Sequence, residues 1–359
     1  MRTLFRPTAF VDSPFGHDGK VARLTGGLCW FSAVEAIAWD GERRVSTDLV
    51  SVERMTEWIA DQPDDEQLAW SRLTGQRPPL QLGERTIRLD QPQVMGIVNA
   101  TPDSFSDGGQ FADAGSAAEA GAGMAAAGAA IVDVGGESTR PGAASIWEGD
   151  EIERVVPVIR QLAGGGAAVS VDTRKAAVME AALAAGARLV NDVSALTFDP
   201  HSAGVVAASG APVVLMHHQG SPESMQDDPR YGDVLVEVYE WLEDRIAAAE
   251  AAGIARDRIL VDPGFGFGKS VAHNLELMNG LALLHGLGCP IMLGASRKRT
   301  IGALSNEAPA DQRLAGSIAL ALKAVEQGAQ LLRVHDVAET VQAIRVWRGL
   351  RDQALTPRA

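Results

Sequence analysis

Residues 94–100 and 130–136 read VMGIVNA and AIVDVGG, two short apolar runs that are followed by turn-forming or glycine residues. Six further runs of this kind come later in the chain: AAVSVDT (167–173), RLVNDVS (188–194), PVVLMHH (212–218), ILVDPG (259–264), PIMLGAS (290–296) and QLLRVHD (330–336). Each run is short, rich in Val, Ile and Leu, and bounded by Gly, Pro or Asp, which is typical of buried parallel strands. The sequence therefore predicts eight strands.

Helical segments separate these runs. Apolar residues recur there at helical spacing, in one set of Leu235, Val238, Leu242 and Ile246 and in another of Leu314, Ile318, Leu322 and Val325. Eight strand–helix units over about 260 residues match the usual length of a (β/α)₈ barrel. A doubly wound sheet is the alternative, because periodicity alone does not close a barrel. The even number of strands favours closure, so the predicted fold class is α/β, a (β/α)₈ TIM barrel with an N-terminal extension.

The composition of the chain changes near residue 91. Residues 1–90 hold acidic clusters, little periodicity and four of the seven tryptophans, Trp30, Trp39, Trp58 and Trp70. We predict an N-terminal extension at 1–90, a (β/α)₈ barrel domain at 91–352 and a C-terminal tail at 353–359. The tryptophans favour a small packed cap over a disordered tail, and an interaction module is the rival interpretation.

The charge balance excludes several classes of partner. The 359 residues carry a formal net charge of −14 and a pI near 5.0. This argues against nucleic acid and against membrane surfaces, because both favour a basic protein face. Two cysteines are too few for a disulfide framework or a CxxC metal site. No transmembrane run or signal sequence is evident, so we expect a cytoplasmic protein.

Polar residues stand at the ends of all eight predicted strands, where a barrel places its active site. They are Asn99, Glu137 with Thr139 and Arg140, Asp172, Asn191 with Asp192, His217 and His218, Asp262, Ser296 with Lys298, and Arg333 with His335. One such residue alone is more often a helix cap or a turn former than a ligand. Eight strand ends of this kind together predict a polar cavity.

The chemistry of these groups indicates what the cavity binds. Carboxylate, amide and ammonium groups suit a flat fragment with adjacent N–H donors, and they come from Asp172, Asn191, Asp262 and Lys298. Positive charge for a phosphate or pyrophosphate comes from Arg140, Arg333 and His335. Asn99 offers an oxygen to a hard cation such as Mg²⁺. The predicted substrate is anionic, planar and rich in nitrogen.

Several motifs resemble those of the dihydropteroate synthases. NATPDSFSDGG (99–109) and GGESTRPGA (135–143) resemble the two signatures of this family. Other motifs follow in the family's order: VDTRK (171–175), NDVSA (191–195), LMHHQGSPESMQ (215–226), DPGFGFGK (262–269), GASRKRTIG (294–302) and RVHD (333–336). The resemblance covers roughly residues 92–350, and so many ordered motifs are very specific.

The resemblance implies a reaction and a set of roles. The family joins a dihydropterin-methyl diphosphate to p-aminobenzoate, releases pyrophosphate, and works with Mg²⁺ as a homodimer. The implied pterin ligands are Asp172, Asn191, Asp262 and Lys298, with Phe267 walling the ring. Thr139, Arg333 and His335 would lie on the diphosphate side, with Arg140 near the pyrophosphate and Asn99 on Mg²⁺. Ser296 and Lys298 would help place p-aminobenzoate. The implied catalytic residues are Lys298, Arg333 and His335.

Two alternatives and two departures accompany this resemblance. A pterin-binding methyltransferase barrel or a non-catalytic paralogue would share the fold and the ring ligands. Family members often carry Met where His218 stands and a hydroxyl residue where Arg299 stands.

GFGFGKS (264–270) invites a phosphate-loop interpretation, but Pro263 occupies the position where that motif needs its first glycine. We interpret this segment as a tight strand-to-helix turn.

Overall fold

The computed structural model describes residues 1–100, 110–137, 146–220 and 228–356. A parallel eight-stranded sheet forms its centre, in the order β12-β11-β10-β9-β8-β7-β14-β13. The strands are β7 (Gln93–Asn99), β8 (Ile131–Gly135), β9 (Val169–Asp172), β10 (Leu189–Asp192), β11 (Val213–Met216), β12 (Ile259–Asp262), β13 (Met292–Leu293) and β14 (Leu331–Val334). A parallel bridge between Val261 and Ile291 joins the two ends of this order. The sheet closes, and the predicted barrel is confirmed.

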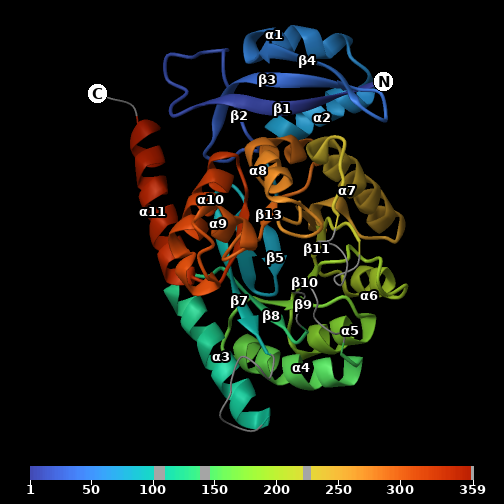
Figure 1. Ribbon diagram of the computed structural model, residues 1–359, viewed down its shortest axis with the longest axis vertical. Helices are drawn as coiled ribbons and strands as arrows, with labels where there is room; N and C mark the ends of the chain where they lie inside the picture. The colour runs from blue at the N-terminus through green and yellow to red at the C-terminus, as the bar shows by residue number, and fades with distance from the viewer. Residues whose placement is uncertain (101–109, 138–145, 221–227, 357–359) are drawn as a thin grey trace.

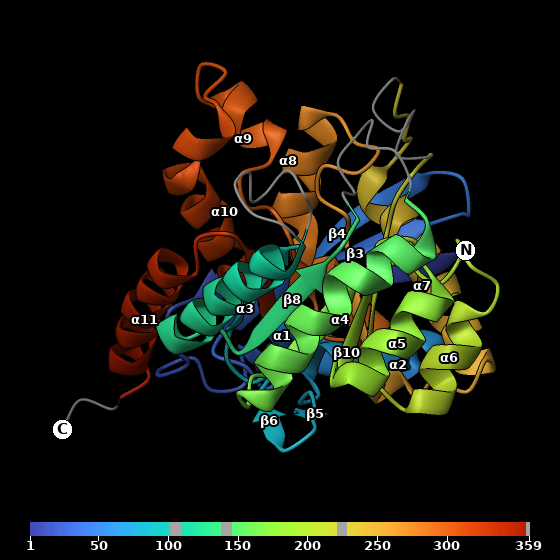
Figure 2. The same cartoon turned by 90° about the horizontal axis from the view of Figure 1, so that it is seen from below.

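Helices surround the sheet as an outer layer (Figure 2). They are α3 (Gln110–Ala127), α4 (Glu148–Gly164), α5 (Ala176–Ala185), α6 (Ser202–Ser209), α7 (Val234–Ala251), α8 (Val271–Gly280), α9 (Arg299–Leu304), α10 (Leu314–Glu326) and α11 (Val337–Ala354), with short 3₁₀ turns η3 (Arg256–Arg258), η4 (Leu281–Leu287) and η5 (Ala310–Gln312). Helix α7 buries all four apolar residues that the periodicity selects in it. The second predicted set lies on α10, where Val325 is buried and Leu314, Ile318 and Leu322 are half-buried.

The lower end of the barrel lumen, at the amino ends of the strands, is apolar. One inward-facing layer is built from Met95, Ile131, Ala168, Leu189, Val214, Leu260, Met292 and Leu331. A hairpin of β5 (Leu80–Leu82) and β6 (Arg85–Ile87) lies at this end (Figure 2). Its Leu80, Leu82 and Ile87, together with Leu89, pack into the same cluster. The hairpin therefore plugs the barrel, and the barrel's core begins before residue 91.

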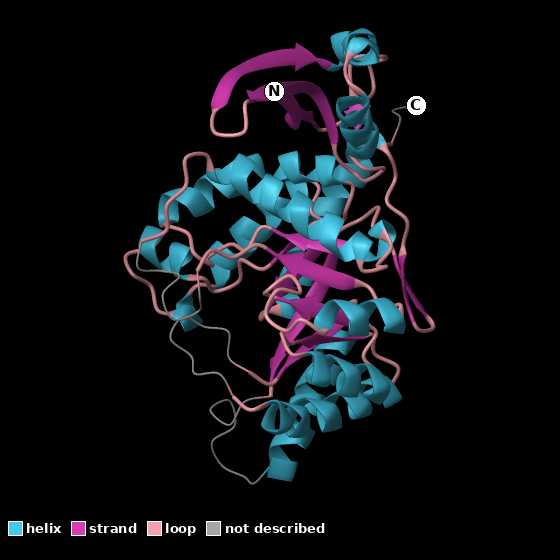
Figure 3. Ribbon diagram, turned by 90° about the vertical axis from the view of Figure 1, so that its right-hand side faces the viewer, coloured by secondary structure: helices cyan, strands magenta, loops and turns pink. Residues whose placement is uncertain are grey.

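The N-terminal residues form a second sheet against the outside of the barrel (Figures 1 and 3). Strand β3 (Trp30–Trp39) pairs antiparallel with β1 (Arg2–Val11), β2 (Ala22–Arg23) and β4 (Arg44–Ser51). Two helices and a short turn follow, namely α1 (Val52–Trp58), η1 (Ile59–Asp61) and α2 (Asp64–Thr74). Trp58 and Trp70 meet Phe5 and Phe31 edge to face at centroid distances of 5.7 and 6.0 Å. The segment packs as a cap, as its tryptophans predict.

The cap is fixed to the barrel by apolar packing and by ion pairs. Its buried residues belong to one continuous cluster with those of the barrel helices. Arg2 pairs with Glu243 of α7 at 2.6 Å. Arg44 pairs at 2.8 Å with Asp233, the N-cap residue of α7. The division at residue 90 stays a prediction as a domain boundary. Within the described ranges, no helix is both long and apolar enough to span a bilayer.

Candidate active site

The upper lumen, above the apolar layer, carries polar side chains. Inward-facing residues alternate along a strand, so the residue two places beyond each apolar lumen residue also points inward. Five of these eight places hold polar residues, namely Asp133, Ser170, Asn191, Asp262 and Arg333, and Asp172 follows Ser170 at the same spacing. The other three hold Ile97, Met216 and Gly294. The Asp, Asn and Ser residues among them are almost fully buried, with 0 to 7% of their surface exposed.

Arg333 connects three of these strands. Its Nε donates to Asp133 Oδ2 and its Nη2 donates to Asp172 Oδ2, each at 2.6 Å. The Nδ2 of Asn191 donates to the same Asp133 oxygen at 3.1 Å. Asp172, Asn191 and Arg333 were predicted from the sequence, and the structure brings them together. Asp133 was not predicted, although it joins the other three.

Several acceptor atoms in this cluster have no partner. Asp133 Oδ1, Asp172 Oδ1, Asn191 Oδ1 and Ser170 Oγ are buried and make no hydrogen bond within the described part of the chain. Leaving a buried polar atom unpaired costs roughly 1–3 kcal/mol, and such atoms are rare in native proteins. A concentration of them in one lumen indicates a place that a ligand with hydrogen-bond donors completes.

The electrostatics of the cluster match this interpretation. Burial raises the pKa of Asp172 to about 7, and the nearby Asp133 carboxylate adds to this, while Arg333 opposes it. Burial also raises the pKa of Asp262. The pKa of Arg333 is raised because Asp133 and Asp172 outweigh the opposing effect of its own burial. The lumen therefore holds carboxylates whose ionisation is sensitive to what binds beside them.

A second group of residues lies on the neighbouring strand exits. Asp262 Oδ1 accepts a hydrogen bond of 2.7 Å from the backbone N–H of Gly264. The Lys298 Nζ atom lies 3.9 Å from the centroid of the Phe267 ring. Burial lowers the pKa of Lys298 to about 8, against the attraction of Asp262. The two predicted residues Lys298 and Phe267 are thus in direct contact.

Ser296 and His335 also lie together, on the exits of β13 and β14. Ser296 Oγ is 3.0 Å from His335 Nδ1, and the His335 backbone N–H donates to the same oxygen at 3.2 Å. Burial and the nearby Arg297 and Arg333 lower the pKa of His335 to about 4. The expectation that His335 supplies positive charge stays a prediction, and it requires a bound anion to raise this pKa.

Arg333 pairs with two carboxylates inside the lumen. Its expected place on the diphosphate side stays a prediction. Thr139 and Arg140 lie outside the described residues. Asn99 ends β7 with its side chain exposed at the mouth of the barrel. No group of three or more His, Cys, Asp or Glu side chains able to hold a metal is found in the ranges that are described.

Sequence reasoning missed two buried networks beside the lumen. Lys175 donates to Glu137 Oε1 at 3.1 Å and to Glu151 Oε2 at 2.6 Å, and Arg174 pairs with Glu137 at 2.9 Å. Glu137, one of the predicted polar strand-end residues, thus has a structural ion-pair role. The signal available in the sequence was the basic pair that closes the VDTRK motif.

The second missed network lies behind Asp262. Lys269 Nζ is 2.8 Å from His217 Nδ1, and the His217 ring also packs edge to face against Trp241 at a centroid distance of 4.9 Å. Lys269 is the lysine of the GFGFGKS segment. The segment forms the expected strand-to-helix turn, and its lysine is buried with only 3% of its surface exposed.

Comparisons with known proteins agree with this geometry. Residues 95–335 match the family model described as "Pterin binding enzyme". The dihydropteroate synthase of Escherichia coli strain K12 is 47% identical over 262 residues, which span 73% of this chain and 92% of that relative. A structure of Xanthomonas albilineans dihydropteroate synthase with 4-aminobenzoic acid superposes with a TM-score of 0.73 at 49% identity and covers 78% of this chain and 100% of that one. A complex of the Xanthomonas albilineans synthase with 7,8-dihydropteroate gives a TM-score of 0.71 at 47% identity, with coverage of 78% and 100%.

Proposed function

The chain belongs to the dihydropteroate synthases of the pterin-binding enzyme family, and we propose from this how its residues perform the reaction. It is a transferase of folate biosynthesis. It condenses (7,8-dihydropterin-6-yl)methyl diphosphate with p-aminobenzoate to give 7,8-dihydropteroate and pyrophosphate. The observation that carries the site proposal is the set of buried, unpartnered acceptor atoms in the upper lumen.

In this proposal the pterin ring occupies the upper lumen. The ring's edge presents adjacent N–H donors, and carboxylate and amide oxygens accept such donors as pairs. Asp172, Asn191 and Asp262 supply the oxygens, and Lys298 donates to an acceptor on the ring. Phe267 walls the ring through its contact with Lys298. The free oxygens of Asp172 and Asn191 support this placement.

We propose that Arg333 and His335 act on the diphosphate side with Thr139 and Arg140. Arg333 begins among carboxylates, so a ring that donates to Asp172 would release part of its guanidinium toward the diphosphate. Burial and the neighbouring Arg297 and Arg333 lower the pKa of His335 to about 4. A pyrophosphate beside it would raise its pKa and favour the imidazolium, because a nearby anion stabilises the charged form. Lys298, Arg333 and His335 are thus the proposed catalytic residues.

The proposed cofactor is Mg²⁺, held at Asn99. The exposed amide at the mouth of the barrel fits a hard cation that keeps most of its waters and phosphate ligands. When bound there, Mg²⁺ would neutralise charge on the departing pyrophosphate. One protein oxygen is enough for such a site, since Mg²⁺ commonly binds proteins through one or two side chains together with substrate phosphates.

The second substrate is proposed to bind at the strand exits. Ser296 and Lys298 lie near the mouth and would place p-aminobenzoate against the pterin methylene. The CH₂–O bond breaks early, its electron pair leaves with the pyrophosphate, and the ring nitrogens stabilise the cationic methylene. The neutral arylamine nitrogen then forms the new C–N bond and loses a proton. The similar Xanthomonas structure with 4-aminobenzoic acid supports a site for this substrate.

Two properties stay predictions from the sequence. We propose that the enzyme works as a homodimer, as the family resemblance implies, and that it acts in the cytoplasm on small-molecule substrates without a nucleic-acid partner. The acidic net charge of −14 supports the exclusion of nucleic acid.

The test is an assay of pyrophosphate release by the purified protein with both substrates and Mg²⁺. We expect turnover that requires each substrate, and we expect Asp262→Ala to abolish it while the fold is retained. Turnover that Asp262→Ala leaves intact would contradict the proposed pterin site. A protein that binds pterin but never releases pyrophosphate would contradict the reaction.

A further inference from the structure

A buried ammonium lies behind the pterin pocket, and the proposed mechanism does not use it. Lys269 ends the loop between β12 and α8, and only 3% of its surface is exposed. Its Nζ lies 2.8 Å from His217 Nδ1, 3.1 Å from the carbonyl oxygen of Gly264 and 3.0 Å from that of Phe267. An ammonium has three N–H donors, so these three acceptors account for all of them.

Two of these acceptors belong to residues that shape the pocket. Gly264 donates its backbone N–H to Asp262 Oδ1 at 2.7 Å, so its orientation sets that of the carboxylate. Phe267 carries the ring that lies against Lys298 at 3.9 Å. Lys269 therefore holds, from behind, the carbonyl of the residue whose N–H bonds Asp262 and the carbonyl of the residue that walls the pterin ring.

The loop lies tightly against the exit of β11. Gly264 adopts φ +68°, and a Cβ at this position would stand 1.8 Å from the His217 carbonyl oxygen. A Cβ on Gly268 would lie 2.5 Å from the Gln219 carbonyl oxygen. The Tyr231 hydroxyl also donates to the Gly268 carbonyl at 2.8 Å. The path of the loop is thus defined at Gly264 and at Gly268, both before Lys269, and Lys269 is bonded to His217, the residue that follows β11.

A purely structural role does not require a charge at this place. Burying an ammonium costs several kcal/mol unless other groups coordinate it fully, and an apolar side chain of similar length would fill the space without that cost. Burial does lower the pKa of Lys269, to about 7, and lowers that of His217 well below its ordinary value. His217 is therefore neutral and can accept through Nδ1, provided that its proton is on Nε2.

We propose that Lys269 and His217 form a positioning pair for pterin binding, which holds the 263–268 loop in the one conformation that aims Asp262 and Phe267 at the ring. The inference rests on the proposed pterin site. The pair touches neither substrate in this scheme and acts only through the loop. It should therefore affect the pterin diphosphate more than p-aminobenzoate, because the loop reaches the second substrate only through the Phe267–Lys298 contact, and Ser296 lies on a different strand exit.

Paired variants at His217 test the inference. His217→Asn keeps a side-chain oxygen that can accept from Lys269, whereas His217→Phe keeps the ring packing and removes the acceptor. We expect His217→Phe to raise KM for the pterin diphosphate at least ten-fold, with KM for p-aminobenzoate within two-fold of the wild type. His217→Asn should stay within three-fold for both substrates. Lys269→Met should behave as His217→Phe does.

A core variant provides the matched control for lost stability. Ile159→Ala lies in the fully buried face of α4, away from the loop, and should lower Tm without altering either KM. The positioning role is wrong if His217→Phe keeps a normal pterin KM, or if its two KM values rise together. It is also wrong if His217→Asn is as impaired as His217→Phe. Failure of the pterin site itself would appear separately, as an Asp262→Ala variant that still turns over.

Discussion

The two halves of the barrel lumen are built in opposite ways. In the lower half, eight apolar side chains meet the leucines and isoleucine of the β5–β6 hairpin. In the upper half, the residues two places further along several of the same strands are carboxylates, an amide, a hydroxyl and a guanidinium, and some of their oxygens have no partner among the described residues. A shift of two residues along these strands thus separates an apolar core from a site with unpaired polar atoms.

This difference teaches that stability and substrate recognition are separated along the strands. The lower layer gains free energy from burying apolar area and needs no ligand. The upper layer holds buried polar atoms that cost free energy until a ligand pairs with them. Substitutions in the two layers should therefore have different consequences, and four predictions test the separation.

The largest expected effect is on stability, in the lower layer. Leu260→Ala removes a fully buried side chain from the plugged lumen. We expect the free energy of unfolding to fall by about 2–5 kcal/mol, because the closed layer cannot collapse around the cavity. Denaturant unfolding measures this, and both KM values should be unchanged at a temperature where the variant is folded. A large rise in the pterin KM would show that the layers are not separate.

The next effect is on activity, in the upper layer. Asp172→Asn removes a carboxylate that is proposed to accept from the pterin ring. We expect kcat/KM for the pterin diphosphate to fall roughly 100-fold, as for the loss of a hydrogen bond to a charged group worth about 2–3 kcal/mol. The free energy of unfolding should fall by less than in Leu260→Ala, because Arg333 keeps its second carboxylate partner, Asp133. A variant that loses activity and also as much stability as Leu260→Ala would contradict the separation.

A smaller effect concerns pH. The folded protein holds the Asp172 proton more tightly than an unfolded chain does, because the pKa rises from 3.8 to about 7. This contribution to stability is therefore present below the unfolded value and is lost as the pH rises toward 7. Ring N–H donors need the ionised carboxylate, so pterin binding should strengthen about ten-fold per pH unit on approaching 7 from below.

Calorimetric titration of a pterin at several pH values would measure this dependence. The same titration of Asp172→Asn is the control. This variant keeps the neighbouring charged groups Asp133, Asp262, Lys298 and Arg333. The slope should be flatter in the variant. Equal slopes would assign the titration to another group and remove Asp172 from the explanation.

The smallest effect is expected on the outer face of the plug. Arg85 is exposed on β6 and donates to the Gly166 carbonyl at 2.6 Å. Arg85→Ala should lower the free energy of unfolding by less than about 1 kcal/mol, because exposed polar contacts are largely replaced by water. Activity should be unchanged. A loss as large as that of Leu260→Ala would mean that the plug is held from outside and not by its apolar face.

Much of the barrel could be predicted from the sequence. Each strand is a short Val- and Ile-rich run with a turn residue after it, and this pattern directly reflects burial on both faces. The strand exits could be predicted in the same way, so Asp172, Asn191 and Asp262 were found as candidates. The topology of the N-terminal sheet could not be predicted, because pairing of β1, β2 and β4 with β3 depends on long-range contacts that leave no periodic signal.

The missed residues share one physical cause. Asp133 stands inside the apolar run AIVDVGG, and its partners Asn191 and Arg333 are distant in sequence. A lone carboxylate within a buried run was a usable signal, since such a group needs a partner. The lowered pKa of His335 has a related origin. Burial and the neighbouring Arg297 and Arg333 lower it, and the residue type alone does not show this.

The closure of the barrel has a consequence for its local opening. Strands β12 and β13 meet through one bridge, Val261 to Ile291, whereas β7 and β8 pair over five residues. Stability within a protein is uneven, and regions with few backbone pairs exchange their amide protons first. We expect the amides of Met292 and Leu293 to exchange with deuterium before those of β8.

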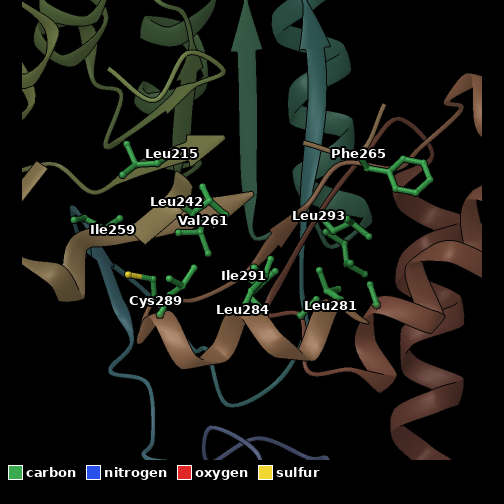
Figure 4. Close-up of a cluster of buried hydrophobic side chains, with 14 of the residues drawn as sticks. Leu215, Leu242, Ile259, Val261, Phe265, Leu281, Leu284, Cys289, Ile291 and Leu293 are labelled. Atoms are coloured by element: carbon green, nitrogen blue, oxygen red, sulfur yellow. The ribbon is translucent and has the colours of Figure 1, made fainter. Parts of the chain in front are cut away.

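The N-terminal cap contributes to the packing around this bridge between Val261 and Ile291. Val261, Ile291 and Leu293 pack against Leu281 and Leu284 of the η4 turn (Figure 4). Strand β1 and helix α2 lie on the other side of that turn, and Arg6 donates to the Asn279 carbonyl just before it. Through the η4 turn, the cap thus contacts the elements that pack against the single bridge between β12 and Ile291. We expect these contacts to limit how often the barrel opens at this bridge.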